Sequence, residues 1–112
     1  MNFRVLGPLE AGDDGAPLSL GPRKQRALLA RLLLDTGRTV AIERLVDDLW
    51  GDDVPETAVK MVQIYVSGLR KAVTPERLHT RPPGYCLELA PGDVLDLHEF
   101  ERLAAAGRAA LA

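Results

Sequence analysis

The sequence has a single cysteine, Cys86, so no disulfide bond can form within the chain. Aromatic residues make up only 4% of the 112 residues, and the core must therefore consist mostly of Leu, Val and Ala. No apolar run approaches the roughly 18 residues that a membrane-spanning helix needs, which excludes a membrane role of that kind. The N-terminus MNFRVLGPLE lacks the layout of a signal peptide, so we expect a cytoplasmic protein.

A catalytic set is also missing from the sequence. His79 and His98 are far apart and neither has the spacing of a zinc motif, while Cys86 falls in an expected strand and is typical of a small packed residue. No Ser–His–acid order and no phosphate-cradling glycine motif is present. We therefore predict a binding protein that is not an enzyme and that has no cofactor and no metal.

The charge is unevenly distributed. The net charge of −2 argues against a nucleic-acid partner, but residues 57–81 hold five basic and one acidic residue, a net charge of +4, whereas residues 41–56 hold one basic and six acidic residues, a net charge of −5. A chain with 27% charged residues always has some clusters, so the pattern alone leaves a nucleic-acid function and a solvated surface equally open.

The segment from Glu56 to Val73 predicts an amphipathic helix of about five turns. One face of this helix is apolar and can pack on a core: Ala58, Met61, Val62, Tyr65, Val66, Leu69 and Val73. The opposite face is a narrow, mostly polar stripe that fits a DNA major groove: Lys60, Gln63, Ile64, Ser67 and Lys71.

The segment after this helix predicts a β-hairpin, or wing, with strands at residues 77–81 and 85–89 around the turn Pro82-Pro83-Gly84. The first strand presents Arg77, His79, Thr80 and Arg81 beside the end of the helix. Of these, Arg77, Thr80 and Arg81 are candidate DNA-binding residues. A helix with a basic wing is an arrangement that reads DNA.

The remaining segments are expected to support these two. Residues 1–20 predict two or three short antiparallel strands, residues 22–36 a helix that ends at Gly37, and residues 42–50 a short amphipathic helix that ends at Gly51. Thr39-Val40 is a possible strand link, and Trp50 is expected in the core. Asp96 is expected to cap one more helix. The predicted class is α+β, with a domain at 1–92 and the first helix of a second, truncated domain at 93–112.

Specific DNA contacts follow from side-chain chemistry. Gln63 can pair with adenine and Ile64 can touch a thymine methyl group. Lys60, Ser67 and Lys71 can reach either base edges or phosphates of the DNA, and Thr57 and Arg70 are better placed for phosphates. Arg81 can enter the minor groove, where arginine reads a narrow width. For each polar residue, a solvated surface position is the competing interpretation.

The loop GDDVPE carries Asp52, Asp53 and Glu56. Two adjacent aspartates without further ligands at fixed spacing indicate a metal site only weakly. Compensation of the dipole at the start of the next helix is a simpler role, and a contact surface for a basic partner is another.

Four blocks, LGPRKQRALLARLLL, IERLVDDLWG, VQIYVSGLRKAV and TRPPGYCLEL, carry a resemblance to a known family. Over residues 2–89 the chain resembles the OmpR/PhoB-type winged helix, in the branch of the Streptomyces antibiotic regulatory proteins (SARP), the AfsR-like activators. The tail LDLHEFERLAAAGRAA looks like the opening of the bacterial transcriptional activation domain that follows in that family.

This resemblance implies a transcription activator that binds double-stranded DNA at direct repeats as a side-by-side homodimer. It also implies contact with RNA polymerase and its sigma factor, with residues 51–56 as the contacting loop. By position, the DNA-facing residues would be Gln63, Ile64, Ser67, Arg70, Lys71 and Arg81.

One departure from the family is Gly68, where many relatives have arginine. Glycine there removes a DNA contact and lowers helix stability by about 1 kcal/mol relative to alanine. An alternative function is therefore a winged-helix protein-interaction module with a lapsed DNA face. The output domain of a phosphorylated response regulator is disfavoured, because the domain begins at Met1.

Overall fold

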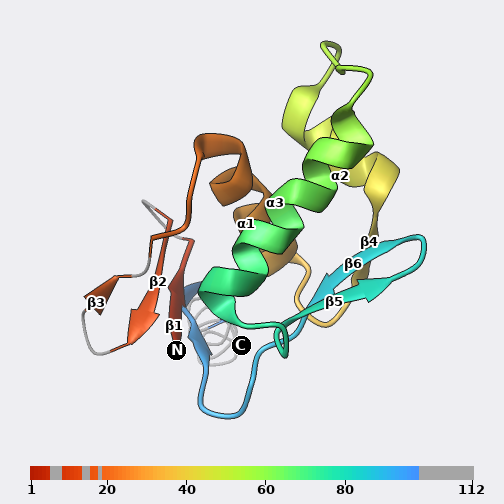
Figure 1. Cartoon of the computed structure of the whole chain (residues 1–112). Helices are drawn as coiled ribbons and strands as arrows, with labels where there is room; N and C mark the ends of the chain where they lie inside the picture. The colour runs from red at the N-terminus through yellow and green to blue at the C-terminus, as the bar shows by residue number, and fades with distance from the viewer. Residues whose placement is uncertain (6–8, 14–15, 18, 99–112) are drawn as a thin grey trace, which may run out of the picture. The chain divides into compact units, whose positions relative to one another are not determined.

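The computed structural model describes residues 1–5, 9–13, 16–17 and 19–98, which belong to two compact units (Figure 1). One unit is formed by Met1–Leu18 together with the chain from Pro91 onward, and the other by Ser19–Ala90. The predicted turn residues Asp14 and Gly15, and the predicted C-terminal helix after His98, lie outside the described residues.

The first unit contains a four-stranded sheet of order β3-β2-β1-β7. Its strands are β1 (Asn2–Arg4), β2 (Glu10–Asp13), β3 (Ala16–Pro17) and β7 (Val94–Leu95). The antiparallel pairing of β1, β2 and β3 confirms the prediction. Strand β7 was not predicted, because two residues carry no periodic signal; it pairs parallel with β1.

Polar contacts join the two chain segments of this unit. The Met1 amino group donates to Asp93 Oδ1 at 2.9 Å, and the Val5 N–H donates to Asp96 Oδ1 at the same distance. Asp96 itself lies in the first helical turn, residues 96–98. These bonds link residues more than 90 positions apart, which a sequence pattern cannot indicate.

Three helices build the second unit: α1 (Arg23–Leu34), α2 (Ile42–Trp50) and α3 (Ala58–Val73). Helix α1 begins after Pro22, whose carbonyl accepts the Arg26 N–H at 3.0 Å. Gly37 has a positive φ of 80°, as predicted, but α1 has already ended at Leu34. Helix α2 has the predicted bounds and is followed by Gly51 at φ 61°.

The apolar faces of these helices form the core of the second unit, with side chains from the strands beside them. Buried residues of this unit include Leu28, Leu29, Leu32, Leu33, Leu45, Val62, Val66, Leu69, Val73, Leu78 and Leu87. On α3 the predicted inner face is confirmed, with Met61 and Tyr65 half-buried at its margins. Trp50 was expected in the core, but it is only half-buried: Lys24 Nζ lies 5.4 Å from its ring centroid and donates to the Leu49 carbonyl at 2.9 Å.

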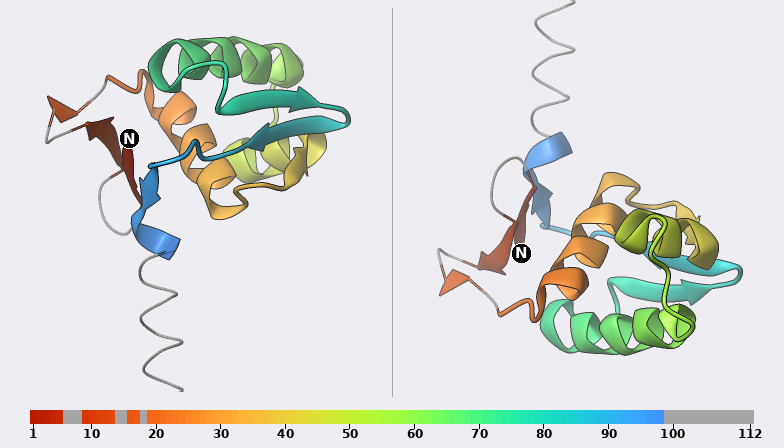
Figure 2. Two further views of the ribbon diagram at one scale, coloured as in Figure 1. Left: turned by 90° about the horizontal axis from the view of Figure 1, so that it is seen from below. Right: turned by 90° about the horizontal axis from the view of Figure 1, so that it is seen from above.

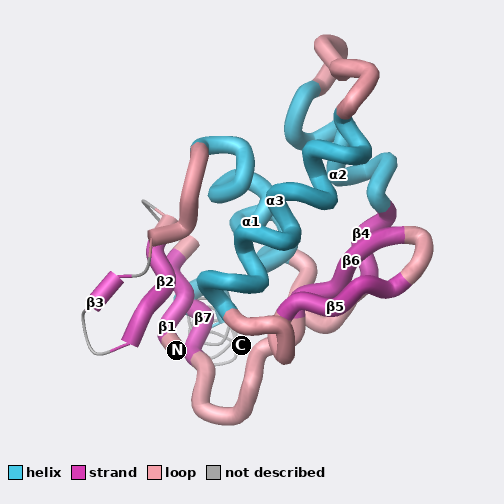
Figure 3. The backbone as a smooth tube through the Cα atoms, viewed as in Figure 1, coloured by secondary structure: helices cyan, strands magenta, loops and turns pink. Residues whose placement is uncertain are grey.

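The predicted hairpin is present as β5 (Leu78–Arg81) and β6 (Gly84–Leu87), and we call residues 78–87 the wing. Its turn is shorter than the predicted Pro82-Pro83-Gly84, because Gly84 belongs to β6 and pairs with Arg81. A third antiparallel strand, β4 (Thr39–Ala41), pairs with β6, so the sheet order is β4-β6-β5 (Figure 3). Gly84 makes this pairing possible: a Cβ there would lie 1.8 Å from the Val40 carbonyl oxygen. The wing therefore belongs to a small sheet, and α3 lies alongside β5 (Figure 2).

Candidate nucleic-acid interface

The outward face of α3 is open to solvent. All five residues predicted there are exposed: Lys60, Gln63, Ile64, Ser67 and Lys71. Ile64 is 58% exposed. In the part of the chain that the structure describes, none of these five side chains forms a hydrogen bond or ion pair. Thr57, immediately before α3, is also exposed.

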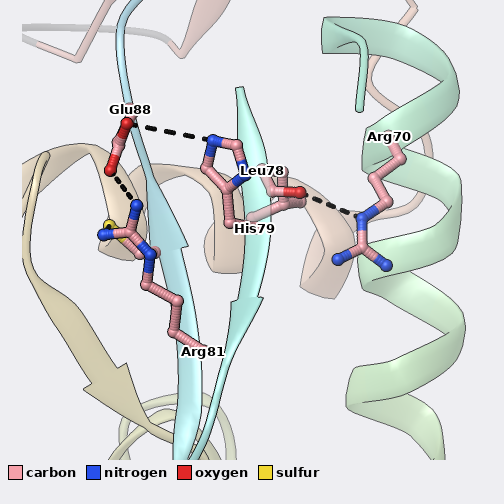
Figure 4. Close-up of polar contacts among 6 residues, drawn as sticks. Arg70, Leu78, His79, Arg81 and Glu88 are labelled. Carbon is pink, nitrogen blue, oxygen red and sulfur yellow. Dashed lines mark hydrogen bonds and ion pairs between the residues drawn. The ribbon is translucent and has the colours of Figure 1, made fainter. Parts of the chain in front are cut away.

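Arg70 is held within the chain. Its Nε donates to the Leu78 carbonyl oxygen at 3.0 Å (Figure 4). Its Nη2 donates to Thr80 Oγ1 at 2.6 Å. The side chain is half-buried and spans from the last turn of α3 to β5. Arg70 and Thr80, both predicted to contact DNA, therefore contact each other in the free protein.

Arg77 also points back to α3. Its Nη1 donates to the Val73 carbonyl oxygen at 2.9 Å and to Thr74 Oγ1 at 3.2 Å. A cation that donates to the last carbonyl groups of a helix satisfies orphan acceptors and interacts favourably with the helix dipole. Thr74, the residue after α3, has a positive φ of 80°, so this end of the helix needs such support.

Arg81 lies at the end of β5 and forms an ion pair with Glu88, in which its Nη2 donates to Glu88 Oε1. Its Nη1 also lies 3.5 Å from Cys86 Sγ. The second oxygen of Glu88 is 3.9 Å from His79 Nε2 (Figure 4). The Glu88 carboxylate thus faces both Arg81 and His79, and it offsets part of the charge of Arg81.

Glu88 was missed in the sequence, although the hairpin register contained a signal for it. Leu78 pairs with Leu87, and Arg81 pairs with Gly84. Side chains two residues apart on a strand share a face, so a register of this kind places Glu88 on the face that carries His79 and Arg81. The register was not certain from the sequence, and the pairing was therefore not predicted.

Gly68 faces α1. A Cβ at Gly68 would lie 2.4 Å from Gln25 Oε1, and a Cβ at Gly21 would lie 2.4 Å from Gln25 Nε2. Gln25 is buried and donates to the Leu20 carbonyl oxygen at 3.0 Å. The glycine interpreted as a missing DNA contact thus makes room for a buried amide between two helices.

The basic residues of α1 do not act alike. Arg23 and Arg26 are exposed, whereas Lys24 is held at the end of α2 as described above. Arg31 bridges Asp35 at 2.6 Å and Asp48 at 2.5 Å, and these carboxylates raise its pKa. Lys24 and Arg31 thus join α1 to α2.

The loop between α2 and α3 is acidic and exposed. Asp52, Asp53 and Glu56 all face solvent, and Val54 within the same loop is 45% exposed. Among the described residues no three His, Cys, Asp or Glu side chains gather so that they could hold a metal ion. No described helix is long and apolar enough to cross a membrane.

A family model described as "Transcriptional regulatory protein, C terminal" matches residues 15–87. The chain is 42% identical over 110 residues to the regulatory protein AfsR of Streptomyces coelicolor, covering 98% of this chain and 11% of that protein. It is 32% identical over 121 residues to the regulatory protein DnrI of Streptomyces peucetius, covering 98% of this chain and 44% of DnrI. The chain thus spans less than half the length of these relatives.

Two solved structures are similar to this chain. Mycobacterium tuberculosis EmbR, in a complex with a low-affinity phosphopeptide, matches with a TM-score of 0.78 and 36% identity over 86% of this chain and 27% of that one. The C-terminal domain of the nisin resistance regulator NsrR, a lantibiotic response regulator, matches with a TM-score of 0.54 and 26% identity over 73% of this chain and 84% of that one.

Proposed function

Since the chain belongs to the family of C-terminal domains of transcriptional regulatory proteins, as an OmpR/PhoB-type winged helix of the AfsR-like (SARP) kind, we propose that it reads double-stranded DNA in a sequence-specific way. The family consists of transcriptional regulators, which agrees with the prediction that the matched region is not an enzyme. The observation that carries the proposal is the outward face of α3, with five exposed side chains and no intramolecular partners for them among the described residues.

In this proposal α3 lies in the major groove. Gln63 hydrogen-bonds a base edge, and Ile64 contacts a thymine methyl group. Lys60 and Lys71 contact phosphates or bases, as do Ser67 and Thr57. The phosphate contacts position α3 on the DNA, and the base contacts recognise the sequence. Gln63 and Ile64 make most of the base contacts.

The wing enters the minor groove through Arg81, which reads the groove width. To do so, Arg81 breaks its ion pair with Glu88 or keeps it while it also contacts DNA. Arg70, Arg77 and Thr80 use their polar groups within the chain. We therefore place these three behind the DNA surface rather than on it.

The relatives support a transcriptional regulator. From the resemblance to the SARP regulators we further propose an activator that binds direct repeats as a side-by-side homodimer and acts on a biosynthetic pathway of secondary metabolism. The α2–α3 loop would contact RNA polymerase and its sigma factor. An exposed acidic loop with Val54 at its centre suits a basic partner surface with an apolar patch. The segment 93–112 would open a helical activation domain.

The test of DNA reading is fluorescence-anisotropy binding to a duplex with two direct repeats about one helical turn apart, beside a scrambled duplex, at several salt concentrations. We expect tighter binding to the repeats and a steep salt dependence. Gln63→Ala should weaken binding to the repeats but not to the scrambled duplex, because it removes a base contact. Ser19→Ala, at an exposed position outside α3, is the matched control.

Equal, weak binding of the parent to both duplexes at low salt would refute this function. It would favour the alternative, a winged-helix module for protein contact with a lapsed DNA face, for which the engaged arginines are the supporting observation. In that case Asp52→Asn with Asp53→Asn should abolish capture of a purified basic partner such as a sigma factor.

The loop proposal has its own test. In transcription in vitro with bacterial RNA polymerase and the longer protein, Asp52→Asn with Asp53→Asn should lower activation several-fold while DNA binding stays unchanged. Equal losses in both assays would show that the loop acts on DNA instead.

A further inference from the structure

The two elements proposed to contact DNA are joined by one side chain. Arg70 comes from the last turn of α3, and its guanidinium reaches two acceptors on β5, the Leu78 carbonyl oxygen at 3.0 Å and Thr80 Oγ1 at 2.6 Å. The two acceptors are two residues apart on one strand. A planar guanidinium with donors in a fixed fork suits this spacing, and an ammonium group does not.

The surroundings of Arg70 support a fixed position. Arg70 is half-buried, and the backbone acceptor belongs to Leu78, which is 1% exposed. Lys71, the next residue on α3, is exposed and forms no side-chain hydrogen bond within the described part of the chain. Adjacent basic residues thus differ in role: one ties α3 to β5, and the other faces solvent.

The chain between the two elements is held as well. Arg77 donates to the Val73 carbonyl and to Thr74 Oγ1, while its N–H donates to the Thr74 carbonyl at 3.3 Å. Four residues therefore connect α3 to β5 with little freedom. Thr80 directly precedes Arg81, so the bond from Arg70 ends one residue from the proposed minor-groove contact.

We propose that Arg70 is a positioning residue that, through Thr80, fixes the wing relative to α3 so that Arg81 and the major-groove side chains engage DNA together; this rests on the proposed function. A second contact on the same molecule strengthens binding in proportion to its effective concentration at the second site. A fixed wing keeps that concentration high. A loosened wing leaves α3 bound and Arg81 mostly disengaged.

The decisive measurement is the penalty of Arg81→Ala in two backgrounds. In the parent we expect Arg81→Ala to weaken binding to the direct repeats by about tenfold, the scale of one good contact. In Thr80→Val, which keeps the β-branched shape but removes the acceptor, the same substitution should cost less than about threefold. The penalty of Gln63→Ala should be equal in both backgrounds, because α3 itself is unchanged.

Arg70→Lys is the second variant. It retains the charge but cannot reach both acceptors, so it should lower the Arg81→Ala penalty as Thr80→Val does. If Arg70 instead contacts a phosphate, Arg70→Lys retains most of the affinity and the tenfold penalty of Arg81→Ala persists. If the tenfold penalty of Arg81→Ala persisted in both Thr80→Val and Arg70→Lys, the proposal would be overturned. A general loss of stability would lower the Gln63→Ala and Arg81→Ala penalties equally, and that result would also overturn it.

A measurement without DNA separates this proposal from the proposed function. Residual dipolar couplings of the α3 and β5–β6 amides should fit one alignment tensor in the parent, and the wing amides should depart from it in Thr80→Val. Unchanged couplings would reject the positioning role even if the protein binds DNA. Absence of sequence preference in the parent, with altered couplings in Thr80→Val, would reject the DNA function and keep the mechanical link.

Discussion

The outward face of α3 and the wing carry similar side chains but differ in what those side chains do. On α3, Lys60 and Lys71 face solvent and form no side-chain hydrogen bonds within the described chain. On and beside the wing, Arg77 caps α3 and Arg81 pairs with Glu88. The two surfaces would contribute to DNA binding in different ways, one by free charge and the other by geometry.

The difference has a simple origin. On a helix, residues on the outward side of the 3.6-residue period are directed away from the rest of the protein, so their exposure follows from periodicity. On a hairpin, neighbours across the strands lie within about 5 Å, and long side chains find partners there. A basic residue on a wing therefore has to be considered with its cross-strand neighbours before it is assigned to a ligand.

The largest effect should come from Gly84→Ala, which tests whether the wing depends on close strand pairing. Its Cβ would lie 1.8 Å from the Val40 carbonyl oxygen, so β6 and β4 must separate. We expect the free energy of unfolding to fall by about 3 kcal/mol, measured by urea denaturation. Gly37→Ala is the control: it has φ 80° but open space around it and should cost about 1–2 kcal/mol. Equal losses would mean that the close approach is readily relieved.

The next effect separates free charge from engaged charge. Lys60→Ala with Lys71→Ala should make the slope of log K against log salt less steep by about 2, at unchanged thermal stability. Arg77→Ala should leave the slope unchanged and lower the free energy of unfolding by about 1 kcal/mol, because helix carbonyls lose a donor. If the lysine variant instead lost stability and Arg77→Ala changed the salt slope, the lysines would be the engaged side chains and Arg77 the one free to contact DNA.

Gly68 belongs to neither surface, because it faces Gln25 on α1. Gly68→Ala gains about 1 kcal/mol of helix propensity, but it displaces Gln25 and weakens its bond to the Leu20 carbonyl. We expect the two effects nearly to cancel in urea denaturation. In a Gln25→Ala background the substitution should stabilise the protein by about 1 kcal/mol. If Gly68→Ala stabilises both backgrounds equally, the Gln25 side chain does not need the space that Gly68 leaves.

A smaller effect should come from Glu88→Gln, which frees Arg81 and removes a negative charge near DNA. Affinity for the direct repeats should rise by about threefold, in keeping with the low energy of exposed ion pairs. In an Arg81→Ala background the gain should be smaller. A loss of affinity in Glu88→Gln would mean that the carboxylate orients Arg81 for binding.

The smallest effect concerns Cys86, which is buried on β6, on the face of the wing that carries His79 and Arg81. Burial raises the pKa of its thiol, because the thiolate is poorly solvated there. The fold thus favours the thiol. The raised thiol pKa contributes to the free energy of unfolding below the ordinary thiol pKa of about 8.5, and this contribution is lost as the pH rises above that value. Denaturation between pH 7 and 10 should show a steeper decline for the parent than for Cys86→Ala; parallel curves would contradict this.

Much of the fold was predictable because it depends on short-range patterns. The bounds of α2 and the inner and outer faces of α3 follow from periodicity and turn residues, and each is confirmed. The hairpin also forms, but its turn is Pro82-Pro83 and not the predicted Pro82-Pro83-Gly84, because Gly84 already pairs with Arg81. The contacts of Arg70 and Gln25 were not predictable, since each depends on how two elements approach. The same applies to β7, which pairs with a strand 92 residues earlier. The contact of Glu88 could be predicted only with the hairpin register known.

The sequence by itself determined which elements form and which face of α3 is polar, because hydrogen bonding along a helix and burial of apolar side chains act over a few residues. Only the tertiary structure decided which basic residues remain free, since that depends on distances of about 3 Å between side chains and acceptors on different elements. Arg70 and Lys71 are adjacent and similarly basic. One is fixed by the carbonyl of Leu78 and the hydroxyl of Thr80, and the other projects into solvent.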